Sequence, residues 1–154
     1  MSAESTTEQS AFETTVQEEI YTKVAQWMQE IFGEEIAVKR ERASVTLMYG
    51  TAYIVVKVYP WGSDEAVIWT RCFVVTGAEI TPECMHYLLR KNADMRLGAF
   101  GLDEDNDIFF EYSLVGTTAD KKELKEAVKA VAQVADKYDE EIRSRWGGER
   151  ATDR

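Results

Sequence analysis

The chain has 154 residues, of which 45% are hydrophobic and 30% are charged, and its formal net charge is −10. This size and composition are typical of one folded domain and exclude a wholly disordered chain. The negative charge argues against binding to nucleic acid or to an anionic membrane surface, and it favours partners with basic segments. Since no stretch approaches the roughly 18 apolar residues of a membrane span, we expect a cytoplasmic protein.

The first predicted element is a helix over residues 11–32, preceded by a polar segment, residues 1–10, that we expect to be a disordered tail. Apolar residues recur at three- and four-residue spacing in two adjacent sets. The first set is Phe12, Val16, Ile20, Val24, Trp27 and Ile31, and the second is Tyr21, Ala25, Met28 and Phe32. Together they cover about half of the helix, which is wider than one packed face. We therefore expect this helix to contact its own sheet and also another helix or a subunit.

Residues 36–75 have the alternation and the β-branched content of strands. We predict three strands here and leave a fourth open, because the boundaries within residues 36–59 are ambiguous. The last of them, Ala66–Val75, is apolar on both faces. An antiparallel strand with one wet face would alternate more cleanly, so we expect a helix or a subunit to cover its second face.

A short helix follows, with Thr81 as its N-cap, Pro82 at its first position and its end near Asn92. Two strands come next, Leu97–Leu102 and Ile108–Leu114, separated by a tight acidic turn.

The last predicted helix has Asp120 as its N-cap and runs to about Arg145 with one narrow apolar stripe. Gly147 ends it, and we expect residues 147–154 to form a second disordered tail. The order α-β-β-β-α-β-β-α predicts one α+β domain over residues 11–146, an antiparallel sheet with helices packed on it.

No residue set has the spacing of a catalytic site. The single histidine, His86, has no neighbouring relay, and Cys84 lies on another side of the same helix, so the two cannot share a metal. Cys72 alternates with apolar residues and is predicted to be a small buried hydrophobe. We expect a protein that is not an enzyme and needs no cofactor.

Two charged stretches are predicted to be structural. Asp103, Asp105 and Asp107 resemble the start of a calcium loop, but Ile108 stands where glycine is needed and Leu114 where glutamate is needed. We predict a β-turn there. The basic stretch 39–42 is predicted to be a solvated strand edge.

The aromatic content of the strands exceeds what core packing needs, and the first helix is unusually wide. Both features indicate a protein–protein or dimer surface. The residues predicted to form it are Tyr21, Trp27, Met28 and Phe32 of the first helix and Trp69 and Phe73 of the third strand.

Four short motifs in the second half of the chain form a recognisable pattern. They are Thr81-Pro82, Leu88-Leu89-x-x-Asn92, Gly98-x-Phe100-Gly101-Leu102 and Ala135-Asp136-x-Tyr138-Asp139. This pattern resembles the YbjN-domain family, whose fold is that of the type III secretion chaperones, also called the Tir-chaperone fold. The resemblance implies the element order given above and a domain that commonly pairs as a homodimer.

The resemblance also implies a class of function. Secretion chaperones of this fold are small and acidic and wrap an extended client segment around hydrophobic patches, whereas YbjN-type proteins are described as sensory or regulatory. We therefore expect a homodimer that binds or regulates an unknown partner protein. A structural or regulatory dimer without a client comes second, and a small-molecule-binding domain or an enzyme last. Leu88, Leu89 and Asn92 are expected to organise the core and the following turn, with Asn92 capping its helix.

Overall fold

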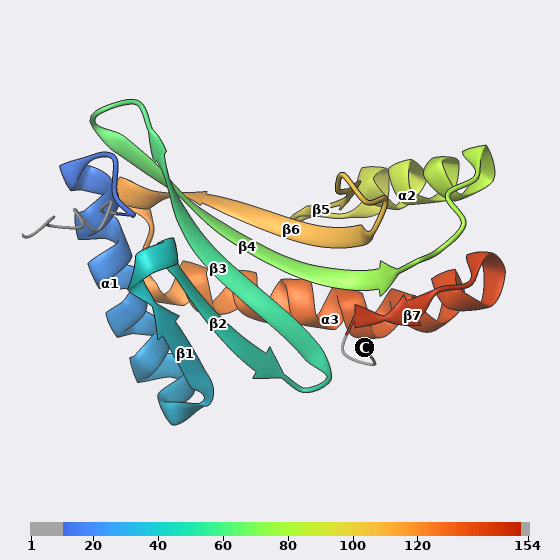
Figure 1. Cartoon of the computed structure of the whole chain (residues 1–154), viewed down its shortest axis with the longest axis horizontal. Coiled ribbons are helices and arrows are strands. Elements are labelled where there is room, and N and C mark those ends of the chain that lie inside the picture. The colour runs from blue at the N-terminus through green and yellow to red at the C-terminus, as the bar shows by residue number, and fades with distance from the viewer. Residues whose placement is uncertain (1–10, 152–154) are drawn as a thin grey trace, which may run out of the picture.

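The computed structural model describes residues 11–151, which form one antiparallel sheet with three helices (Figure 1). The helices are α1 (Thr15–Phe32), α2 (Pro82–Asp94) and α3 (Lys121–Trp146). The strands are β1 (Ile36–Lys39), β2 (Ser44–Tyr49), β3 (Ala52–Trp61), β4 (Glu65–Thr76), β5 (Ala99–Leu102), β6 (Ile108–Val115) and β7 (Glu149–Arg150). The sheet order is β1-β2-β3-β4-β6-β5, with β7 paired to the end of β4. The predicted α+β class is confirmed.

Two short strands extend the predicted order. β1 pairs with β2 in the register Ile36↔Leu47, so four strands, not three, precede α2. β7 lies within the segment that was predicted to be a disordered tail, and that prediction is wrong for Glu149 and Arg150. Gly148 permits this return, because a Cβ there would lie 2.6 Å from the carbonyl oxygen of Thr76. The predicted tail over residues 1–10 lies outside the described residues, as do residues 152–154.

Helices α1 and α3 lie on the same face of the sheet, and in Figure 1 β3 crosses in front of α3. Alternate residues of β3 and β4 point to these helices, and the buried ones include Ile54, Val56, Val58, Ala66, Ile68, Thr70 and Cys72. The apolar stripe of α3, from Leu124 to Ile142, completes the core. None of the helices in residues 11–151 is both long and apolar enough to cross a membrane.

The wide apolar surface of α1 has two partners within the chain. Toward the sheet, the Tyr21 hydroxyl donates to the Ser44 carbonyl at 2.9 Å and the Gln17 amide donates to the Val58 carbonyl at 2.9 Å. On another side α1 contacts α3, where Glu30 and Lys121 form an ion pair at 2.9 Å. The predicted second partner of α1 is thus a helix of the same chain.

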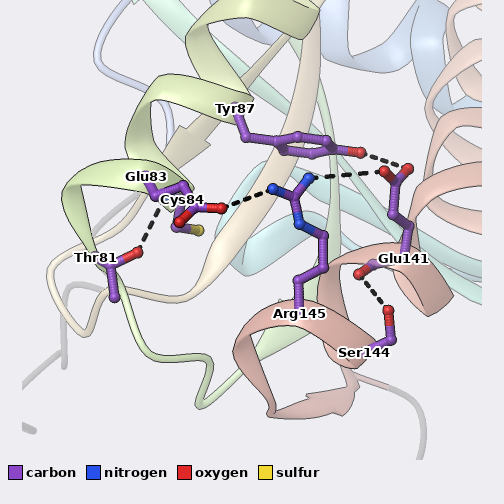
Figure 2. A network of polar contacts seen from close by, with 7 residues as sticks. All are labelled: Thr81, Glu83, Cys84, Tyr87, Glu141, Ser144 and Arg145. Atoms are coloured by element: carbon purple, nitrogen blue, oxygen red, sulfur yellow. Dashed lines mark hydrogen bonds and ion pairs between the residues drawn. The ribbon is translucent and has the colours of Figure 1, made fainter.

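Helix α2 lies at the other end of the molecule and is tied to α3 by the polar network of Figure 2. The Thr81 hydroxyl accepts from the Cys84 N–H at 3.0 Å, which confirms the predicted N-cap. The Tyr87 hydroxyl donates to Glu141 at 2.8 Å, and Arg145 bridges Glu83 at 2.8 Å and Glu141 at 3.9 Å. These side-chain contacts with α3 therefore help to position α2.

The family motifs have structural roles around β5. The Asn92 side chain forms two hydrogen bonds with the backbone of Phe100, accepting at 2.6 Å and donating at 3.1 Å. The Phe100 ring packs edge-on against Phe110 and Tyr138, with centroids 5.2 and 5.7 Å away. Gly101 leaves room for the Phe109 ring, which a Cβ would strike. The prediction that Asn92 caps α2 is wrong, because its amide is committed to β5.

The two leucines of the motif differ in burial. Leu88 is 5% exposed and belongs to the core, as predicted, whereas Leu89 is 69% exposed. The prediction that Leu89 organises the core is wrong, because only the side of this short helix that carries Cys84 and Leu88 is buried.

Candidate binding face of the sheet

The sheet face opposite α1 and α3, which we call the open face, is built from the alternate residues of the central strands. Tyr53, Val55, Lys57 and Tyr59 of β3 and Trp69, Arg71 and Phe73 of β4 lie on it. None of these side chains is fully buried, and no helix of residues 11–151 packs against them. The expected cover over the second face of β4 is thus absent from the described part of the chain.

A hollow of about 410 Å³ occupies the open face. Its walls are Lys39, Arg42, Tyr53, Val55, Lys57, Tyr59, Trp69, Arg71 and Phe73, and its lining also includes Ser44 and Thr46. Both of these short side chains are at least 95% buried and therefore form its floor. Longer residues on the neighbouring strands stand above them, which makes the hollow a groove with aromatic and cationic walls.

One side of the groove is a stacked platform centred on Arg71. The Arg71 guanidinium lies 3.9 Å from the Trp69 ring centroid and 3.5 Å from that of Phe109. It also donates twice to one carboxylate oxygen of Glu111, at 3.1 and 2.8 Å. Cation–π and charge-assisted contacts of this kind hold a guanidinium in one orientation.

Further aromatic pairs extend the platform. Tyr59 meets Trp69 edge-on with centroids 5.6 Å apart, and Phe73 meets Phe109 at 6.2 Å. The antiparallel register places Trp69 opposite Ser113 and Arg71 opposite Glu111. The sequence-based prediction names Trp69 and Phe73 but not Arg71, Phe109 or Glu111, because only the strand register brings these residues together.

The six residues predicted to form one surface lie in three environments. Tyr21 and Met28 are core residues, 1% and 0% exposed. Trp27 and Phe32 are half-buried on α1 and pack against the core. Trp69 and Phe73 lie on the open face, on the opposite side of the sheet. The predicted surface is therefore divided by the sheet, and only its strand part faces the groove.

The two cysteine thiols are buried and have raised pKa values. Cys72 and Cys84 are both buried, as predicted for Cys72. Burial, with a smaller contribution from the Asp139 carboxylate, raises the pKa of Cys72 to about 12. Burial also raises the pKa of Cys84. Since the thiolate is the reactive form, these residues are poor nucleophiles near neutral pH.

The acidic turn between β5 and β6 brings carboxylate oxygens of Asp103, Asp105 and Asp107 within 4.8 Å of one another. One Asp103 oxygen accepts from the backbone N–H groups of Asp105 and Asp107, at 3.0 and 2.9 Å. Asp107 accepts from the N–H of Gly77 at 3.0 Å. The carboxylates thus shape the predicted turn and fasten it to the end of β4.

Comparison with known proteins gives one family and one fold. The family model TY-Chap1, described as T3SS (YopN, CesT) and YbjN peptide-binding chaperone 1, matches residues 18–154. No curated protein matches the chain.

Three solved complexes share the fold. The crystal structure of the ExsC–ExsE complex aligns with a TM-score of 0.63 at 10% identity, covering 82% of this chain and 96% of the other. The HopA1–SchA chaperone–effector complex aligns with a TM-score of 0.61 at 10% identity, covering 79% and 94%. The Yersinia pestis type III secretion chaperone SycH, in complex with a fragment of YscM2, aligns with a TM-score of 0.54 at 18% identity, covering 77% and 98%.

Proposed function

Because the chain belongs to the TY-Chap1 family of T3SS and YbjN peptide-binding chaperones, we propose that it binds a segment of a partner protein on its open face. The observation that carries the proposal is the groove of about 410 Å³ between β1 and β4, which has aromatic walls and no helix of residues 11–151 above it. The three similar structures are complexes of two proteins, which supports a protein partner.

The exposure of the open face supports binding. Tyr53 is 40% exposed and Tyr59 is 39% exposed, and Trp61 at the end of β3 is 68% exposed. Contiguous exposed aromatic surface on a soluble domain marks interaction sites, and tyrosine and tryptophan dominate the energetics of such sites. A partner segment that covers this face would remove these rings from water while the sheet stays unchanged.

We also propose that the protein is a homodimer and that α2 contributes to the contact. Met85 and Leu89 lie one helical turn apart on α2, and both are exposed. A two-fold axis beside α2 would bury the same patch of both copies, which is the usual arrangement of a homodimer. This contact would leave the open face of each copy free for its partner.

A small-molecule-binding function is the second candidate, because a volume of about 410 Å³ lies within the range of ligand pockets. We rank it lower because such pockets enclose most of their ligand, whereas this groove is open along the sheet. An enzymatic function has least support: among the described residues that line the groove there is no histidine, cysteine or carboxylate.

Selection from a displayed library of random peptides on the immobilised full-length protein tests the proposal. The wild-type protein is expected to enrich a set of related peptides, and Trp69→Ala with Phe73→Ala is expected to abolish the enrichment. Trp27→Ala on α1 is the matched tryptophan control and is expected to retain it. Failure of the wild-type protein to enrich any peptide would contradict the proposed function.

A further inference from the structure

The groove on the open face has a charge opposite to that of the whole protein. Its lining contains four cations, Lys39, Arg42, Lys57 and Arg71, and no carboxylate. The chain as a whole carries a formal net charge of −10. From the net charge we expected a basic partner, but the groove presents the other sign at the place where a partner would lie.

The cations are aligned by the strand register. Lys39 pairs with Ser44, Ser44 with Lys57, and Lys57 with Trp69, so two lysines and a tryptophan lie in one row across four strands. Neighbouring strands are about 4.8 Å apart, so the Cα atoms of Lys39 and Lys57, two strands apart, are separated by about 10 Å. The next row carries Arg71 opposite Val55. A segment crossing these strands would meet positive charge at one end and aromatic surface at the other.

Most of this positive charge is not neutralised within residues 11–151. Arg71 is paired with Glu111 at 2.8 Å. Lys39, Arg42 and Lys57, in contrast, have no carboxylate within 4 Å among the described residues, and Lys57 lies 5.0 Å from the centroid of the Tyr59 ring. Arg40 next to this patch is paired with Glu18, at 2.8 Å, and therefore adds little.

Local charge decides which segment fits. Electrostatic interactions in physiological salt are screened over about 8 Å, so acidic residues on the far side of the sheet act weakly on the groove. Charge complementarity at the contact then selects the partner and disfavours one of like sign.

We propose that the open face accepts an acidic amphipathic segment of a partner protein. Its carboxylates would lie on Lys39, Arg42 and Lys57, and its apolar side chains on Trp69 and Phe73. This inference rests on the proposed function, that the open face binds peptide segments, and adds the chemical class of the segment.

Three labelled peptides test the inference by fluorescence anisotropy on the full-length protein. They share the same leucine and phenylalanine positions, and the remaining positions are glutamate, lysine or serine. The glutamate peptide is expected to bind about tenfold or more tightly than the lysine peptide, and its affinity is expected to fall as salt is raised. Lys39→Glu with Lys57→Glu should weaken the glutamate peptide about tenfold, while Lys23→Glu with Lys125→Glu, on exposed helix positions, should not.

The remaining outcomes separate the inference from the proposed function. Tighter binding of the lysine or serine peptide, or an unchanged affinity in the Lys39→Glu, Lys57→Glu variant, would overturn the inference and leave peptide binding intact. Binding of none of the three peptides, together with a failed library selection, would overturn both. Concentration-dependent self-association that is lost in the Lys39→Glu, Lys57→Glu variant would show that the acidic surface of a second copy fills the groove, and would overturn the inference.

Discussion

At the scale of single residues, a few polar side chains join segments that are distant in sequence. Arg71 links β4 to β6 through Glu111, and Asn92 links α2 to β5 through the Phe100 backbone. Tyr87 links α2 to α3 through Glu141. Each contact pairs groups that would otherwise lose their hydrogen bonds to water on folding, so removing one partner costs more than the net value of the bond.

Tyr87 gives a pH-dependent test of the link between α2 and α3. Burial, and next the hydrogen bond to Glu141, raise the pKa of Tyr87 above its ordinary value of 10.0. A raised pKa in the folded state favours the neutral phenol, so this stabilisation is complete below about pH 10 and is lost as pH rises further. Tyr87→Phe should therefore destabilise the protein by about 1 kcal/mol at neutral pH and by less above about pH 10.

Urea unfolding of the wild-type protein and of Tyr87→Phe, from neutral pH to above about pH 10, measures the difference in their free energies of unfolding. Tyr21, whose pKa burial also raises, is present in both proteins and cancels in the comparison. A wild-type advantage that stays constant above about pH 10 would show that Tyr87 does not make the contact with Glu141.

Sequence reasoning succeeded at residue scale where the signal is local. The Thr81 and Asp120 caps were both predicted, because each accepts from a backbone N–H three residues later. It failed for Asn92 and Leu89, whose environments depend on which segments pack beside α2. Helical spacing places Leu88 and Leu89 together, and only the packing of α2 against the rest of the domain decides which of them is buried.

At the scale of elements, the periodicity of the sequence predicts all three helices and the long strands. It does not predict on which face of the sheet each helix packs. The apolar width of α1 correctly indicated two contacts, yet it could not place α1 and the groove-facing residues of β4 on opposite faces of the sheet. The sequence leaves β1 open because a strand of four residues carries too little pattern, and it does not predict β7 because the pairing of β7 with β4 depends on the path of the chain after α3.

Helix α2 gives the test of the proposed dimer. Light scattering of the wild-type protein should give about twice the chain mass of 17.6 kDa. Leu89→Glu should weaken dimerisation about tenfold or more, because it would place a charge in an apolar contact. Val38→Glu is the matched control, since Val38 is similarly exposed, at 52%, but lies on β1. A wild-type monomer, or a Leu89→Glu protein that remains fully dimeric, would rule out this interface.

At the scale of the whole molecule, the net charge and the charge of the groove have opposite signs. The net charge describes the field around the protein at a distance, while the sheet register concentrates cations and aromatic rings in one groove. The fold class and family were predictable from the sequence. The groove was not, because its walls come from β1, β2, β3 and β4, and no short motif spans them.

The central claim, that the partner lies on the open face, is tested most directly by fluorine NMR of protein labelled with 5-fluorotryptophan. The four tryptophans report on separate regions: Trp27 on α1, Trp61 at the end of β3, Trp69 in the groove and Trp146 at the end of α3. Single tryptophan-to-phenylalanine variants assign the resonances. On addition of the glutamate peptide we expect the Trp69 resonance to shift, while those of Trp27 and Trp146 stay in place. A shift of Trp27 with Trp69 unchanged would place the partner on α1 and contradict the account.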